Sequence, residues 1–131
     1  MNQEIGLVEA KRWLFQAQED ILSAEANLRE ERFYMVALCA HQASEKALKA
    51  LIIKTNGKMA PKIHDLRKLG ELVRVPSDLI AILEMLAPAY MTSRYPDALE
   101  GEIPAEAFRA DDATRLLDAA KQVVLWATNQ I

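Results

Sequence analysis

The chain has 131 residues, of which 51% are hydrophobic, 27% are charged and only four are glycine. A chain of this length buries roughly two thirds of the surface that its unfolded form exposes, so it needs no disulfide or metal to form a core. The composition excludes disordered and collagen-like classes. We expect one globular domain over residues 1–131, and the many alanine, leucine and acidic residues favour helix.

Cys39 is the only cysteine, so the chain has no internal disulfide and a reducing compartment is expected. Residues 1–9 lack a basic start followed by an apolar run, and nowhere do eighteen apolar residues follow one another. These features predict a cytoplasmic protein.

The net charge of −3 is unevenly distributed. The segment from residue 46 to residue 74 holds eight lysines and arginines against two acids, so it is near +6 and the remainder of the chain is near −9. Such a segment either attracts phosphate groups or an acidic partner, or is a solvated helix end and loop. Its basic residues are Lys46, Lys49, Lys54, Lys58, Lys62, Arg67, Lys68 and Arg74.

The first expected helix runs from about Ile5 to Arg29. Apolar residues recur in it at alternating spacings of three and four, which is a heptad seam that buries one stripe of the helix. The seam consists of Leu7, Ala10, Leu14, Ala17, Ile21, Ala24 and Leu28.

A second helix is expected from Phe33 to Asn56, where Gly57 supplies the left-handed conformation that closes a helix. One face of it carries only small residues, which would let neighbouring helices approach closely, so we expect this helix to be central. These residues are Ala37, Ala40, Ala43, Ser44, Ala47 and Ala50. The two helices form an antiparallel hairpin.

A polar stripe shares the second helix, because Gln42, Glu45, Lys46 and Lys49 recur at helical spacing. Two interpretations remain open. The stripe is either a solvated face, in which Glu45 and Lys49 form an ordinary ion pair between residues four apart, or the polar wall of a cleft or dimer seam.

Shorter helices follow. Asp65 is a suitable cap for a third helix that ends before Pro76, and Ser77 is a suitable cap for a fourth. The apolar stripe of the fourth helix includes Tyr90, but Pro88 either kinks this helix or ends it near Ala87. Residues 92–109 show no period, and a fifth helix is expected from Asp111 to Asn129. With no strand pattern in the sequence, the fold class is all-α.

No glycine-rich phosphate loop, Cys-x-x-Cys pair or nucleophile elbow occurs. His41 and Glu45 are four residues apart, but no further ligand is spaced to complete a metal site, so neither a metal nor a cofactor is predicted. His64 either binds a phosphate or holds its loop by a hydrogen bond to backbone. Arg94 either grips a phosphate beside an aromatic ring or pairs with Asp97 or an acid of the second helix.

Four motifs, taken in order, resemble the HEPN family, a nucleotide-binding domain of higher eukaryotes and prokaryotes. They are Ala17, Asp20 and Ala24 in the first helix, residues 42–50 (QASEKALKA) in the second, His64-Asp65-Leu66, and Ser93-Arg94-Tyr95-Pro96-Asp97. The resemblance implies an up-and-down bundle of four to five helices that dimerises. It also implies frequent pairing with a small nucleotidyltransferase in arrangements such as toxin and antitoxin.

Many members of that family are metal-independent ribonucleases whose site is an arginine, four to six residues, then a histidine. This chain departs from that pattern, because eight residues separate Arg32 from His41 and no histidine follows Arg94. Whether Arg94 and His64 meet in space is left open by the sequence.

The leading hypothesis is therefore a homodimeric, non-enzymatic module that binds a nucleotide, RNA or a nucleotidyltransferase partner. The alternatives are a metal-independent ribonuclease that uses His64 and Arg94, and a helical scaffold with no ligand. The predicted ligand-binding residues are Gln42, Glu45, Lys46, Lys49, His64, Asp65, Arg94, Tyr95 and Asp97.

Overall fold

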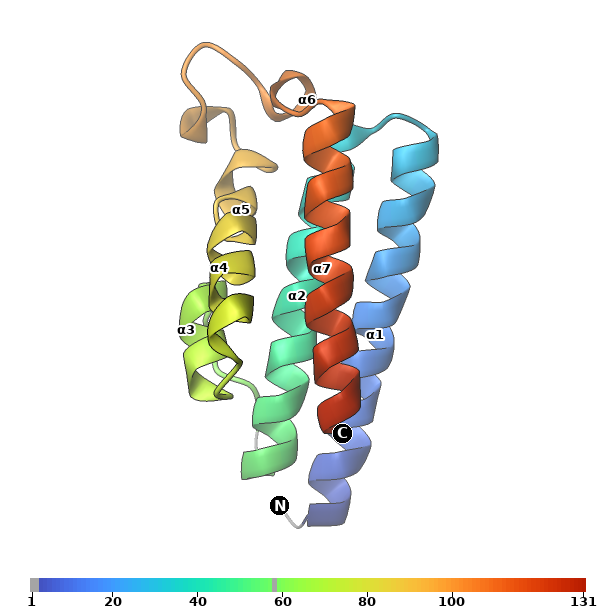
Figure 1. Ribbon diagram of the computed structural model, residues 1–131, viewed down its shortest axis with the longest axis vertical. Helices are drawn as coiled ribbons and strands as arrows, with labels where there is room; N and C mark the ends of the chain where they lie inside the picture. Colours follow the sequence, from blue (N-terminus) through green and yellow to red (C-terminus); the bar gives the residue numbers. More distant parts are fainter. Residues whose placement is uncertain (1–2, 58) are drawn as a thin grey trace.

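The computed structural model describes residues 3–57 and 59–131. Met1 and Asn2 lie outside the described residues, and so does Lys58, which is one of the cations of the predicted basic segment. Every regular element in the described part is helical, as expected (Figure 1). The elements are α1 (Gln3–Arg29), α2 (Phe33–Asn56), α3 (Leu66–Leu72), α4 (Ser77–Leu86), α5 (Ala89–Thr92), the 3₁₀ turn η1 (Pro96–Ala98), α6 (Pro104–Ala107) and α7 (Ala110–Gln130).

The long helices form an up-and-down bundle. In Figure 1, α1 rises, α2 descends behind α7, α4 and α5 rise on the other side, and α7 descends between the two sides. The start of α1 and the end of α7 therefore lie at the lower end of the bundle, and the segment from residue 93 to residue 109 crosses its top. This arrangement confirms the predicted fold class.

The hairpin of α1 and α2 follows the sequence closely. Ala10, Leu14, Ala17 and Ala24 of the heptad seam are buried. Near the lower end the two backbones approach so closely that a Cβ atom added to Gly6 would lie 3.0 Å from the Cα of Gly57. All six residues of the small face of α2 are buried, which confirms that α2 is central.

The predicted ends of the middle helices are partly wrong. Asp65 caps α3 as expected, because its carboxylate accepts hydrogen bonds from the backbone N–H of Arg67 (3.0 Å) and Lys68 (3.3 Å). Ser77 does not cap α4; it is the first helical residue, and Pro76 occupies the capping position without a side-chain bond. Helix α4 ends at Leu86, and α5 adds one turn after Pro88.

The segment predicted to be irregular contains only the short elements η1 and α6. Helix α7 then begins and ends one residue outside the predicted bounds, and Asp112 accepts a hydrogen bond from the backbone N–H of Arg109 at its start (3.0 Å). Side chains from α2, α3, α4 and α7 form the largest core cluster. No helix in the described residues is long and apolar enough to cross a membrane.

Candidate functional site

The polar stripe of α2 is not a solvated face. Glu45 is 6% exposed and Lys49 is 5% exposed, so burial rules out that interpretation for both residues. The neighbouring Lys46 is half-buried and points to α1, where its Nζ lies 2.7 Å from Oδ2 of Asp20. The stripe therefore has two parts. Glu45 and Lys49 form a buried ion pair, and Lys46 forms an ion pair with a residue of α1.

Glu45 is the centre of a hydrogen-bonded cluster. Its Oε2 accepts a hydrogen bond from Nζ of Lys49 at 2.9 Å, and Nδ1 of His64 lies 3.2 Å and 3.1 Å from its two carboxylate oxygens. Burial alone would raise the pKa of Glu45, but the hydrogen bonds from Lys49 and His64 outweigh burial and lower that pKa. Glu45 is therefore an ionised carboxylate inside the bundle.

His64 lies between the buried carboxylate and solvent. The sequence left open a phosphate contact or a hydrogen bond to backbone; the structure instead directs Nδ1 to the side chain of Glu45. With 51% of its side chain exposed, His64 has Nε2 left for a ligand. The adjacent Asp65 is occupied in capping α3, so its carboxylate serves the fold.

Tyr90 connects the parts of the site. The ring of His64 stacks on it with centroids 4.6 Å apart and planes 22° apart, and Cζ of Arg94 lies 4.6 Å from the Tyr90 centroid. His64 and Arg94, which are distant in sequence, therefore meet on one aromatic ring. Cation–π contact accounts for the position of the Arg94 guanidinium.

Arg94 has no counter-ion in the part of the chain that the structure describes. Neither Asp97 nor an acid of α2 lies within ion-pair distance, in contrast to one of the two sequence-based interpretations. Its Nε is also buried without a hydrogen bond among these residues. A half-buried guanidinium that lacks a counter-ion can bind an anion.

His41 is the residue that the predicted site lacked. It is fully buried, its ring lies 5.3 Å from that of Tyr90, and its Nδ1 lies 3.8 Å from Oε1 of Glu45. Within the described residues neither ring nitrogen makes a hydrogen bond of normal length and angle. Burial is the main cause that lowers the pKa of His41 to about 4, Arg94 and the ring of His64 add to it, and Glu45 and the His64 backbone oppose it. His41 is therefore neutral at pH 7.

The remaining predicted residues lie apart from this cluster. Tyr95 and Asp97 are exposed in the segment that crosses the top of the bundle, and Gln42 is half-buried on α2. Among the described residues no hydrogen bond joins any of these three to Glu45, His64 or Arg94. The structure thus unites four of the nine predicted residues: Glu45, Lys49, His64 and Arg94.

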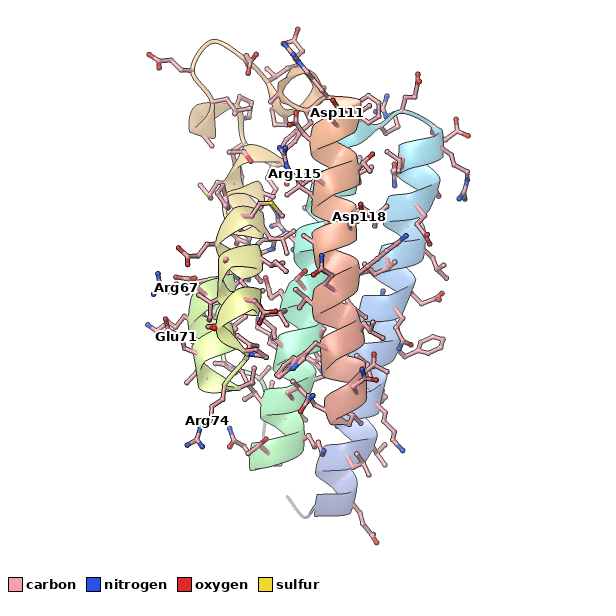
Figure 2. The ribbon with its side chains drawn as sticks, in the orientation of Figure 1. Arg67, Glu71, Arg74, Asp111, Arg115 and Asp118 are labelled. Atoms are coloured by element: carbon pink, nitrogen blue, oxygen red, sulfur yellow. The ribbon has the colours of Figure 1, made fainter. Side chains whose placement is uncertain are left out.

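Among the described residues, three cations of the predicted basic segment pair with acids, and a fourth donates to a backbone carbonyl. Lys46 and Lys49 are paired as described, Lys54 donates to the Gln130 carbonyl at 2.6 Å, and Arg67 pairs with Glu71 at 3.0 Å and Glu84 at 3.5 Å. Glu71 and Glu84 raise the pKa of Arg67. Figure 2 shows Arg67, Glu71 and Arg74 at the outer edge of the bundle, on the side of α3.

Two hollows meet at His64. One, of about 540 Å³, lies between α1, α2 and the loop before α3; its lining includes Trp13, Lys49, Ile53, Pro61, Lys62 and His64. The other, of about 550 Å³, lies between the start of α3 and the junction of α4 and α5; its lining includes His64, Arg67, Pro88, Tyr90 and Met91. Both volumes are in the range of ligand pockets. No group of three or more His, Cys, Asp or Glu residues that could hold a metal occurs in the described part.

Comparison with known proteins extends over nearly the whole chain. The family model of the HEPN domain matches residues 10–131. The crystal structure of TT1696 from Thermus thermophilus is similar, with a TM-score of 0.86, 28% identity, and coverage of 93% of this chain and 98% of that one. The structure of ST0689, an archaeal HEPN homologue, has a TM-score of 0.78, 26% identity, and coverage of 92% and 96%.

No curated protein matches the sequence. The family model covers more than nine tenths of the chain, and the fold has the helical arrangement of a solved HEPN homologue. The chain therefore belongs to the HEPN domain family.

Proposed function

We propose that this protein is a non-enzymatic HEPN module that binds the phosphate of a nucleotide between Arg94 and His64. The observation that carries the proposal is the guanidinium of Arg94, which rests on Tyr90 and has no counter-ion among the described residues. The face of an aromatic ring attracts a cation but supplies no full negative charge. A phosphate supplies that charge and can accept two parallel hydrogen bonds from a guanidinium.

His64 is the second proposed contact, since its ring stacks on the same Tyr90 ring that the Arg94 guanidinium contacts. Glu45 binds its Nδ1, which fixes the ring and directs Nε2 away from the buried carboxylate. Lys62, on the wall of the hollow between α1, α2 and the loop before α3, provides a flexible positive charge nearby. Trp13 lines the same hollow and offers a ring on which a base can stack.

The oligomeric state and partner in this proposal rest on family membership. HEPN domains generally dimerise. We infer a homodimer that works with a small nucleotidyltransferase, as in toxin and antitoxin pairs.

Titration calorimetry with ATP in EDTA tests the site. Arg94→Gln should weaken ATP binding by roughly 10- to 100-fold, because a charge-assisted hydrogen bond is worth about 1.5–3 kcal/mol. Arg74→Gln is the matched control, since Arg74 carries the same charge at the outer edge of α3 (Figure 2). Equal affinities for ATP in the wild type and Arg94→Gln would refute the site.

One observation favours a second candidate, a metal-independent ribonuclease. The Glu45 to His64 pair orients an imidazole that contacts the same Tyr90 ring as the Arg94 guanidinium, and an imidazole with a cation is the combination that cleavage of RNA needs. His64 would take the proton of a ribose 2′-hydroxyl as its oxygen attacks phosphorus, a 2′,3′-cyclic phosphate would form, and the bond from phosphorus to the 5′-oxygen would break as that oxygen takes a proton from water. The cation would stabilise the charge on the phosphate.

Labelled single-stranded RNA incubated with the protein in EDTA separates the two candidates. The binding module leaves the RNA intact on a denaturing gel. The ribonuclease would instead cleave the RNA, both as the wild type and as the Arg74→Gln control. If this cleavage disappears in a folded His64→Gln variant, the second proposal replaces the first.

A further inference from the structure

The outer face of α1 carries a row of exposed apolar side chains. Val8 is 59% exposed, Phe15 is 64% exposed and Leu22 is 57% exposed. They are seven residues apart, so they lie along one line on the helix at intervals of about 10 Å. Single exposed apolar residues are ordinary, but three that are aligned on one face of a helix, one of them a phenylalanine, are typical of a contact surface.

A hollow of about 610 Å³ adjoins the middle of this row. Its lining includes Trp13, Phe15, Gln16 and Lys46, so it lies on the side of α1 that faces α2. The apolar row therefore has a recess beside Phe15, and polar side chains surround both. An apolar centre with a polar rim is the anatomy of a protein interface.

The charges beside the row are arranged about Phe15. Lys11 and Arg12 lie one turn before it and Glu19 lies one turn after it. Within the described residues Lys11 and Glu19 have no ion pair, and Arg12, whose side chain is 74% exposed, pairs only with Glu9 of its own helix at 2.6 Å. Positive charge thus precedes the phenylalanine and negative charge follows it.

We propose that a second copy of this chain covers the row, with the two α1 helices antiparallel and Phe15 on the two-fold axis. Val8 and Leu22 are each seven residues from Phe15, so Val8 of one copy meets Leu22 of the other. Lys11 and Glu19 are each four residues from Phe15, so opposite charges lie level across the seam. The inference rests on the homodimer in the proposed function and identifies its face.

The charge pattern selects this orientation. A parallel pair centred on Phe15 would place Lys11 level with Lys11 and Glu19 level with Glu19, and like charges across a helix seam repel. The antiparallel pair places each lysine level with a glutamate. The surface is therefore complementary to itself in one orientation only.

Cysteine crosslinking tests the position of the axis. In a Cys39→Ser background, Phe15→Cys should give a disulfide-linked dimer on a nonreducing gel after treatment with oxidised glutathione, because residues on the axis are close enough to bridge. Val8→Cys alone should not crosslink, whereas the Val8→Cys/Leu22→Cys double variant should. No dimer from Phe15→Cys, or a dimer from Val8→Cys alone, overturns the proposed arrangement.

Sedimentation velocity tests the contacts. Phe15→Glu, with a helical circular dichroism spectrum, should dissociate at concentrations roughly 100-fold above those that dissociate the wild type, because it removes a central aromatic contact. Glu19→Lys should weaken the dimer by about 5- to 10-fold, and the Lys11→Glu/Glu19→Lys exchange should restore it.

A Phe15→Glu variant that remains dimeric would overturn the α1 face but leave the proposed homodimer intact. A wild type that is monomeric at all concentrations would overturn both. Neither result bears on the Arg94 site, which the ATP titration tests separately.

Discussion

The polar cluster on α2 and the apolar row on α1 both depart from ordinary burial, and they lie on adjacent helices. On α2, a carboxylate, an ammonium group and an imidazole are buried among helices. On α1, a phenylalanine and two aliphatic side chains are exposed. In the first region the buried polar groups stabilise one another, whereas in the second no residue that the structure describes covers the apolar side chains.

This difference separates a polar cluster that the chain itself mostly satisfies from an apolar surface that we propose a second copy covers. The Glu45 cluster is mostly satisfied by Lys49 and His64, and the only buried side-chain nitrogens without a hydrogen bond among the described residues belong to Arg94 and His41. Hydrogen bonds and charge pairing offset the cost of burying polar groups. No internal contact offsets the exposure of Phe15.

The largest effect is expected from removing the carboxylate. Glu45→Ala leaves the Lys49 ammonium buried without its partner, so it should lower the free energy of unfolding by about 3–5 kcal/mol at pH 7. Urea unfolding followed by circular dichroism measures this loss. The Glu45→Ala/Lys49→Met double variant, which buries no unpaired charge, should lose less than Glu45→Ala alone. A loss below about 1 kcal/mol for Glu45→Ala would mean that Lys49 reaches water in solution.

A smaller effect is expected from the titration of His41. Its pKa is near 6.5 in the unfolded chain and about 4 in the folded protein, so between these values the unfolded chain binds more protons. Stability therefore falls as the pH falls from 6.5 towards 4. Between pH 7 and pH 5 the folded state should lose about 2 kcal/mol from this residue.

Urea unfolding of the wild type and His41→Gln at pH 7 and pH 5 checks the sign. The variant should lose less stability than the wild type over this interval, because glutamine does not titrate. The lowered pKa of Glu45 contributes only below its usual value near 4.5, where that carboxylate begins to gain a proton in the unfolded chain. An equal loss in both proteins would show that His41 is accessible to protons in the folded state.

Much of the fold could be predicted because the determining signals are local. The heptad seam fixes which face of α1 is buried, Gly57 ends α2 with a positive φ of 63°, and Asp65 caps α3. Ser77 failed as a cap because Pro76 already has a φ that suits the capping position, and no hydrogen bond from the serine is needed to start α4. Local chemistry thus gave every long helix and missed only details of the ends.

The site was harder to predict because three separate segments build it. Glu45 and Lys49 share a helix, and their spacing shows that they can pair, but only the packing of the loop before α3 and of α5 shows that the pair is buried. Tyr90 looked like part of an apolar stripe, and its role as the common ring for His41, His64 and Arg94 depends on the turn after Pro88. For His41 a signal existed, since it lies one turn before Glu45.

The smallest effect on the fold of a single chain is expected at Phe15. At concentrations that dissociate the proposed dimer, Phe15→Gln should change the free energy of unfolding by no more than about 0.5 kcal/mol, because the ring makes little contact within its own chain. The neighbouring Leu14 is 6% exposed, and Leu14→Ala should cost about 2–5 kcal/mol under the same conditions. At high protein concentration the wild type should gain stability by mass action, whereas Phe15→Gln should not. Urea unfolding midpoints measured at two protein concentrations test both effects. If the midpoints of the wild type and Phe15→Gln depend equally on protein concentration, the contact between copies lies on another face.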